Sequence, residues 1–292
     1  THNVSSAASD VYKRQDHTLS STSDQTRLAK TFTQLRKSKS KALVSFITVG
    51  DPTLDHTLAF LQGLVEGGVD VLELGIPFSD PEAEGPSIQA ANERALKGGA
   101  TLKDVLDQVK LFRKINSDTP IVLMGYLNSI IAMPDFEKRA FEAGVDGLIM
   151  VNLPPEEGEK IAQPLAAQSI DLIYLLAPTT TKERSQEIVE VASGFLYYVS
   201  LKGITGADHF DSVEVTRKVK ELKELTDLPI CVGFGIKDGE TAKKIAPYAD
   251  GIVVGSAFVD LVAKGGSPSE ISARLKEKAS ELRVAIDSTK VS

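Results

Sequence analysis

The chain has 292 residues, of which 42% are hydrophobic, and a formal net charge of −7 that comes from 33 basic and 40 acidic residues. No segment gathers the basic residues into a patch, so nucleic acid and anionic membrane surfaces are poor candidates as partners. The longest apolar runs have only the length of a strand, the single cysteine Cys231 fits a reducing, cytoplasmic compartment, and the four histidines lack metal-ligand spacing, so we expect neither a membrane span nor a metal site.

The N-terminal residues differ from the rest of the chain. Residues 1–24 are polar and rich in Ser, Thr and Asp, and we expect a disordered or artefactual tail there. Residues 25–292 are predicted to form one catalytic domain, because a barrel of this length is usually a single domain. Between Gln25 and Lys37 the apolar residues recur at helical spacing, which predicts a helix that closes one end of the core.

Eight short runs rich in Val, Ile, Leu and Tyr follow this helix, and amphipathic segments separate them. The runs begin near residues 42, 70, 120, 147, 171, 195, 229 and 251. The expected helices are 54–66, 87–97, 102–115, 135–143, 156–168, 181–193, 212–226, 238–246, a short stretch at 258–263, and 268–286. Buried strands that alternate with helices indicate a parallel sheet in an α/β protein, and eight repeats are the number that closes a (β/α)8 TIM barrel. An open, doubly wound sheet is the alternative, but no G-x-G-x-x-G follows the first strand.

Two connections are longer than the others, and both are candidates for functional loops. The connection after the second strand holds Glu84 and an extra helix that begins near Pro86. The connection after the sixth strand holds residues 202–210, whose glycines and small residues suit a mobile lid.

A carboxylate stands inside the second predicted strand. Because side chains alternate between the two faces of a strand, Leu72 and Leu74 share one face and Glu73 lies on the other. Burial of an ionised group costs several kcal/mol unless the group is paired or partly hydrated. Glu73 and the nearby Glu84 therefore form a candidate acid–base pair. The alternatives are an ordinary ion pair for Glu73 and a solvated loop charge for Glu84.

The last two strands end in small residues that suit an anion. A phosphate in a TIM barrel frequently lies on the loops after strands seven and eight. Here these strands end at Gly235 and at Gly255 with Ser256, and the second pair precedes a short helix. Glycine lets backbone N–H groups approach an anion, and a helix N-terminus adds favourable partial charge. We expect a phosphate on these three residues, with Gly206 of the predicted lid as a further contact.

Several strings together resemble one known family, the alpha subunit of tryptophan synthase, across residues 25–266. The matching strings are FITVGDP at 46–52, ELGIPFSDP at 73–81, GITGA at 203–207, GFGI at 233–236 and GSA at 255–257. The resemblance implies a TIM-barrel lyase that cleaves indole-3-glycerol phosphate to indole and glyceraldehyde 3-phosphate. It implies no cofactor in this chain. It also implies a beta-subunit partner in an alpha2beta2 heterotetramer, where the partner carries pyridoxal phosphate and receives the indole.

The resemblance also implies roles for individual residues. Glu73 would be the acid–base catalyst, and Glu84 would hold the indole N–H and stabilise charge on the ring. The family usually has Asp at the position of Glu84, and the extra methylene group could displace the carboxylate by about 1 Å. The implied indole pocket is Phe46, Met124, Ile149, Leu175, Tyr197 and Phe234, with Thr205 orienting Glu84. Ordinary core packing is the alternative for each pocket residue, above all for Ile149 and Leu175.

Further residues would dock the beta subunit. The implied docking surface is Pro77, Asp80, Pro81, Tyr126, Asn128, Leu153 and Pro154. Two other functions stay open at this point. Lys202 could form a Schiff base as in a class I aldolase, or the barrel could be non-catalytic and only activate a beta-type partner.

Overall fold

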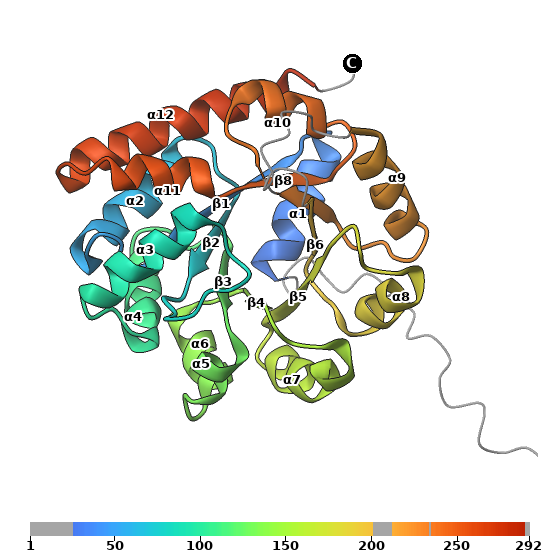
Figure 1. Ribbon diagram of the computed structural model, residues 1–292, viewed down its shortest axis with the longest axis horizontal. Helices are drawn as coiled ribbons and strands as arrows, with labels where there is room; N and C mark the ends of the chain where they lie inside the picture. Colours follow the sequence, from blue (N-terminus) through green and yellow to red (C-terminus); the bar gives the residue numbers. More distant parts are fainter. Residues whose placement is uncertain (1–25, 201–211, 234, 290–292) are drawn as a thin grey trace, which may run out of the picture.

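The computed structural model describes residues 26–200, 212–233 and 235–289. Eight parallel strands close into a barrel in sequence order, and helices form a ring around them (Figure 1). The predicted (β/α)8 fold is therefore confirmed. The open doubly wound sheet is wrong, because β1 also pairs with β8, where Ala42 lies beside Gly251. The tail predicted for residues 1–24 and the lid predicted for residues 202–210 lie outside the described residues.

Each strand begins within one residue of its predicted start. The strands are β1 Ala42–Thr48, β2 Val71–Gly75, β3 Ile121–Gly125, β4 Gly147–Met150, β5 Asp171–Leu176, β6 Leu196–Val199, β7 Ile230–Gly233 and β8 Gly251–Val254. The apolar runs predict these starts well because a strand that is covered on both faces is apolar along its whole length, so its first residue coincides with the start of the run.

The described helices match the predicted ones, with one addition. They are α1 Arg27–Lys37, α2 Leu54–Glu66, α3 Pro86–Lys97, α4 Leu102–Arg113, α5 Leu127–Ile131, α6 Phe136–Ala143, α7 Pro155–Ala167, α8 Lys182–Val191, α9 Ser212–Lys223, α10 Gly239–Ile245, α11 Ser256–Ala263 and α12 Pro268–Asp287. The sequence did not predict α5, because five residues without a side-chain cap give no helical period. None of the described helices has both the length and the apolar character needed to cross a membrane.

The core has two layers, one on each side of the sheet. Outward-facing strand residues such as Leu72 and Leu74 pack with the surrounding helices. Inward-facing residues such as Val71 and Val122 fill the barrel. The apolar side chains of α1 join this inner layer, and in Figure 1 the helix lies inside the ring of outer helices, so α1 closes one end of the barrel as predicted.

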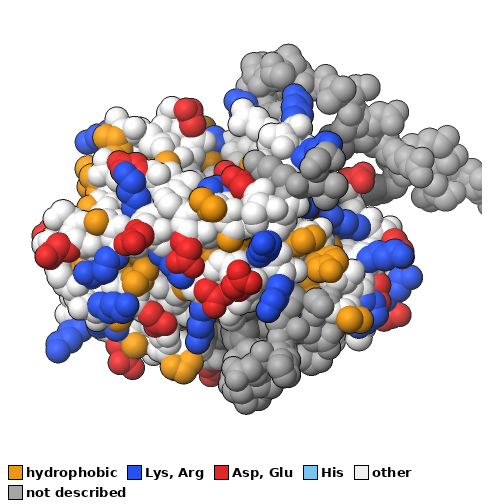
Figure 2. Space-filling view, turned by 90° about the horizontal axis from the view of Figure 1, so that it is seen from above, with side chains coloured by type: hydrophobic (Ala, Val, Ile, Leu, Met, Phe, Trp, Pro, Cys, Tyr) orange, Lys and Arg blue, Asp and Glu red, His pale blue; other side chains and the backbone are white. Residues whose placement is uncertain are grey.

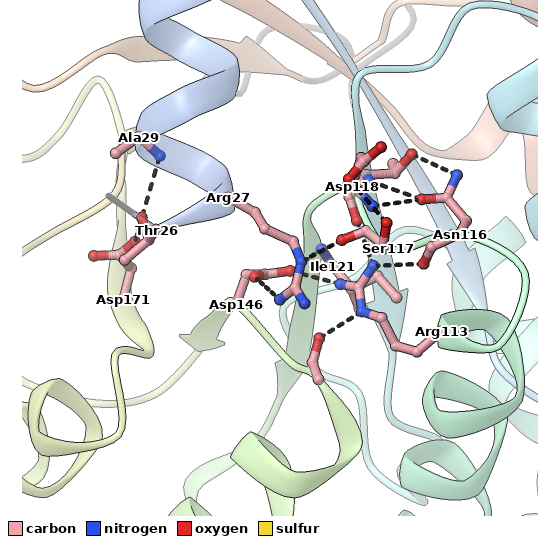
Figure 3. A network of polar contacts seen from close by, with 12 residues as sticks. Thr26, Arg27, Ala29, Arg113, Asn116, Ser117, Asp118, Ile121, Asp146 and Asp171 are labelled. Atoms are coloured by element: carbon pink, nitrogen blue, oxygen red, sulfur yellow. Dashed lines mark hydrogen bonds and ion pairs between the residues drawn. The ribbon is translucent and has the colours of Figure 1, made fainter. Parts of the chain in front are cut away.

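At the N-terminal ends of the strands, buried carboxylates are paired. Asp146, which directly precedes β4, accepts from Arg27 Nη1 at 2.8 Å, from Arg113 Nη2 at 2.7 Å and from the backbone N–H of Ile121 at 2.8 Å (Figure 3). These partners belong to α1, α4 and β3, so one carboxylate joins three elements. Opposite charges and an N–H offset the cost of removing this carboxylate from water.

The same arrangement recurs before two other even-numbered strands. Asp70 precedes β2 and accepts from the N–H of Leu43 on β1 at 2.8 Å and from Arg283 at 2.8 Å. Asp250 precedes β8 and accepts from the N–H of Ile230 on β7 at 3.0 Å. In each case the aspartate before an even strand binds the start of the preceding odd strand. We call Asp70, Asp146 and Asp250 the strand clamps.

The surface carries both signs of charge. On the face that Figure 2 displays, acidic and basic side chains are interspersed over the described residues, and apolar side chains are scattered among them. This distribution agrees with the sequence, in which no segment concentrates the basic residues.

Candidate active site

Glu73 lies in the middle of β2 and faces the barrel interior. Its neighbours in the sheet are Phe46 on β1 and Val122 on β3. The residue is only 1% exposed, and its Oε2 has no hydrogen-bond partner among the described residues. No described cation acts on it, which argues against an ordinary ion pair. Burial, helped by the charge of Glu84, raises the pKa of Glu73 to about 8.

Glu84 lies in the connection between β2 and α3 and is partly buried. Burial raises its pKa to about 7, although a hydrogen bond from Asn92 opposes this shift. This burial argues against the alternative that Glu84 is a solvated charge in a loop. Because the charge of Glu84 contributes to the raised pKa of Glu73, the structure brings the two predicted carboxylates together.

Two side chains hold the connection that carries Glu84. Asn92 on α3 accepts from the backbone N–H of Phe78 at 2.8 Å and donates from Nδ2 to Glu84 Oε2 at 2.9 Å. The ring of Phe78 stacks on Tyr126, with 4.6 Å between centroids, and the Tyr126 hydroxyl accepts from the N–H of Ala83 at 3.2 Å. Burial and nearby carboxylates raise the pKa of Tyr126 to about 12, so this hydroxyl stays protonated.

Sequence analysis did not assign Asn92 and Tyr126 to the catalytic site. A signal for Asn92 existed: it follows Ile88 by four residues, so it shares the face of α3 that turns toward the barrel. A polar side chain on a buried helical face needs partners, and here one partner is Glu84. No comparable signal singles out Tyr126, because a tyrosine after an apolar strand is an ordinary core residue.

The predicted apolar pocket has a cavity side and a core side. Phe46 packs with Met124, Ile88 and Ala91 near the carboxylates. Tyr197 lines a cavity and lies near Glu73, whose charge helps to raise its pKa. Ile149 belongs instead to the layer that fills the barrel and is 0% exposed, and the half-buried Leu175 packs against this layer, as Met124 and Tyr197 also do. The predicted contacts Phe234 and Thr205 lie outside the described residues.

Two glycines make room for the aromatic side chains. A Cβ atom on Gly75 would lie 2.6 Å from the Phe46 ring, and one on Gly233 would lie 2.5 Å from the Tyr197 ring. Neither contact is sterically possible without movement of a ring. These glycines at the ends of β2 and β7 therefore set how far the two rings reach into the barrel.

Three of the four predicted phosphate residues meet at one cavity of about 290 Å³. They are Gly235, Gly255 and Ser256, whereas Gly206 lies outside the described residues. The full lining is Gly85, Pro86, Ser87, Ile88, Tyr197, Gly235, Ile236, Lys237, Val253, Gly255 and Ser256. The N-termini of α3 and α11 both reach this cavity, as an anion site requires.

The sequence did not single out Lys237 or Ser87 as residues of this cavity. No described residue forms an ion pair with Lys237. Within the described ranges, no group of three or more His, Cys, Asp or Glu residues is placed to hold a metal. Lys202, the alternative Schiff-base lysine, lies outside the described residues. The site thus combines two carboxyl groups that titrate near neutral pH, an aromatic wall and an anion-binding end.

Comparisons with known proteins agree with one another. A family model described as "Tryptophan synthase alpha chain" matches residues 32–287. A tryptophan synthase alpha chain of Burkholderia ambifaria is 47% identical over 263 residues, which are 89% of this chain and 97% of that protein. One of Chromobacterium violaceum is 48% identical over 262 residues, 89% of this chain and 99% of that protein. The crystal structure of tryptophan synthase subunit alpha from Legionella pneumophila superposes with a TM-score of 0.83 at 41% identity, and covers 90% of this chain and 99% of that one.

Proposed function

Since this chain belongs to the tryptophan synthase alpha chain family, we propose that Glu73 and Glu84 carry out the reaction of that family in its barrel. The chain is a lyase of tryptophan biosynthesis that cleaves indole-3-glycerol phosphate to indole and glyceraldehyde 3-phosphate. The observation that carries the assignment is the pair of buried, electrostatically coupled carboxyl groups, one inside β2 and one on the connection that follows it, with pKa values of about 8 and 7.

Glu73 moves the proton. A retro-aldol cleavage needs a proton on the indole carbon that leaves and removes a proton from the glycerol hydroxyl. With a pKa of about 8, Glu73 is mostly protonated at neutral pH and can protonate the ring carbon. The resulting carboxylate then takes the hydroxyl proton as the carbon–carbon bond breaks, and the bond electrons return to the ring. Glu73 ends the cycle protonated, so the step balances.

Glu84 stabilises the ring during this step. Its carboxylate accepts the indole N–H and offsets the positive charge that develops on the protonated ring. This role needs the ionised form, which a pKa of about 7 makes available at neutral pH. Phe46, Met124 and Tyr197 hold the ring, and Ile149 and Leu175 support them from the core. Phe234 and Thr205 complete the pocket by family resemblance.

The phosphate binds in the cavity that Gly235, Gly255 and Ser256 line. Backbone N–H groups near Gly235 and Gly255, together with Ser256 at the start of α11, receive it, and Gly206 adds a contact by resemblance. Gly235 has φ +70°, a backbone conformation that favours glycine, so this residue type is required there.

The partner we propose is a tryptophan synthase beta subunit in an alpha2beta2 assembly in the cytoplasm. This chain would then need no cofactor of its own, and the pyridoxal phosphate would belong to the beta subunit. In the monomer Pro77, Tyr126 and Leu153 are buried, so the expected docking surface must be corrected. The residues of this surface that remain accessible to a partner are Asp80, Pro81, Asn128 and Pro154.

One assay tests the function and the partner together. Indole formation from indole-3-glycerol phosphate is measured with the chain alone and during titration with a beta subunit. We expect activation that saturates, and a Pro81→Ala, Asn128→Ala double variant should shift the midpoint to a higher beta-subunit concentration, about tenfold, if these residues anchor the complex. An unchanged midpoint would show that Pro81 and Asn128 do not belong to the docking surface. No activity in either condition would contradict catalysis by the barrel, and borohydride trapping of substrate would instead favour the Lys202 aldolase.

A further inference from the structure

A buried amide lies behind the carboxylate of Glu84. Asn92 on α3 is only 3% exposed. Its Oδ1 accepts from the N–H of Phe78, and its Nδ2 donates to Glu84 Oε2 and to the carbonyl of Ile88, both at 2.9 Å. All three bonds fix the orientation of the amide, because a flipped amide would present N–H groups to the N–H of Phe78.

Asn92 differs from the other groups that hold this connection. Gln89 donates to the backbone carbonyl of Glu84 at 2.8 Å, and Tyr126 accepts from the N–H of Ala83. Both groups contact the backbone. Among the described residues, Asn92 is the one donor to the Glu84 carboxylate, and no described cation faces that carboxylate.

Titratable groups approach Glu84 from the neighbouring elements, and none of those described is a cation. Glu73 approaches from β2, and the Tyr126 hydroxyl, which is neutral at working pH, lies at the end of β3. Asp80 and Glu82 lie on the same connection as Glu84, and the charges of all three carboxylates raise the pKa of Tyr126. Burial adds to the cost of the charge. The hydrogen bond from the Asn92 amide is the described interaction that offsets this cost.

We propose that Asn92 is a positioning residue of the cleavage reaction, and that its amide holds the Glu84 carboxylate, ionised and in place, where the indole N–H of the substrate meets it. This inference rests on the proposed function and adds a residue to it. The amide occupies one carboxylate oxygen and leaves the other free for the substrate. Asn92 also offers a reason why a glutamate works here, since the amide fixes the end of a side chain that is one methylene longer than aspartate.

The test is the pH profile of kcat/KM for indole formation by the full chain. In the wild type the acid limb reports the ionisation of the site carboxylates as a pair. In Asn92→Ala we expect this limb to move up by about one pH unit and the rate at pH 7 to fall about tenfold, because a hydrogen bond to a charged group is lost. In Asn92→Ser the hydroxyl can donate to the carbonyl of Ile88, and we expect the acid limb to move in the same direction as in Asn92→Ala. This second variant keeps the test valid if the alanine variant fails to fold.

Two controls separate positioning from support of the loop. Gln89→Ala removes a bond to the Glu84 backbone on an exposed side chain and should leave the limb in place. In a Glu84→Gln background, Asn92→Ala should lower the residual kcat/KM less than twofold. The proposal is overturned if the Asn92 variants lose rate equally at every pH, if Gln89→Ala shifts the limb as far, or if the tenfold loss persists without the Glu84 carboxylate. The wild-type rate tests the proposed function independently.

Discussion

The two ends of this barrel treat buried carboxylates in opposite ways. At the N-terminal end Asp146 is held by two arginines and a backbone N–H. At the C-terminal end Glu73 is equally buried, but no described cation accompanies it and its Oε2 has no described partner. Both residues are buried carboxylates of the same barrel, so the residue type does not decide the role. The partners decide it: a saturated carboxylate joins elements, and an unsaturated one is ready to exchange a proton.

The contrast exists even along one short stretch of chain, which comprises β2 and the residue before it. Asp70 and Glu73 are three residues apart, and burial raises the pKa of both. For Asp70 the N–H of Leu43 and the charge of Arg283 oppose the shift, whereas for Glu73 the second contribution, from Glu84, adds to it. A structural carboxylate thus stands directly before β2, and a catalytic one stands in the middle of that strand.

The largest expected effect is on activity at the C-terminal end. Glu73→Gln keeps the shape of the side chain and removes the proton carrier, so cleavage should fall by a factor of about 10² to 10⁴ while substrate still binds. The measurement is the single-turnover rate of indole release together with the substrate affinity. A variant that keeps more than about a tenth of the wild-type rate would exclude this role.

The matching change at the other end should affect stability instead. Asp146→Asn leaves the Arg113 guanidinium, which is 11% exposed, without its charge partner. We expect a loss of about 3 kcal/mol in the free energy of unfolding, and a kcat per folded molecule within about twofold of wild type. Urea unfolding and active-site titration measure the two quantities. Loss of kcat at unchanged stability would mean that the two ends do not divide these tasks.

The pH dependence of stability sharpens the comparison. The folded pKa of Glu73, about 8, lies above its ordinary value of 4.5, so its favourable contribution is complete below pH 4.5 and is lost as the pH rises through 8. Glu73→Gln lacks this loss. Its stability relative to wild type should therefore increase between pH 5 and pH 8 by an amount on the order of 3 kcal/mol. Parallel stability curves for the two proteins would show that Glu73 is not buried as described.

The smallest expected effect concerns a cation. At the N-terminal end each strand clamp has a basic partner, an arginine for Asp70 and Asp146 and Lys223 for Asp250, whereas Lys237 lines the phosphate cavity with no described ion-pair partner. Because Lys237 is exposed, its attraction for a phosphate is screened by solvent. We expect Lys237→Ala to raise KM about threefold with kcat unchanged, and the difference to shrink at high ionic strength. If KM did not change in Lys237→Ala, the Lys237 ammonium group would not lie near the bound phosphate.

The sequence predicted those features that depend on local pattern. Eight apolar runs located the strands, and a glutamate among leucines located the inward face of β2. Features that depend on contacts across the fold were missed. The bond from Asn92 to Glu84 joins a helix to a connection eight residues earlier, and the stacking of Phe78 on Tyr126 joins connections from different strands. Burial of Leu153 was missed for the same reason, since its chain neighbours do not reveal what packs on it.

The Asp70 clamp also determines which way the catalytic residue points. Its carboxylate ties the start of β2 to the N–H of Leu43 on β1. If β2 slid by one residue against β1, that bond would break, and every side chain of β2 would exchange faces. Glu73 would then enter the apolar layer beneath the helices, and a leucine would occupy the active site. Asp70, three residues before Glu73, thereby determines that the catalytic carboxylate faces the barrel interior.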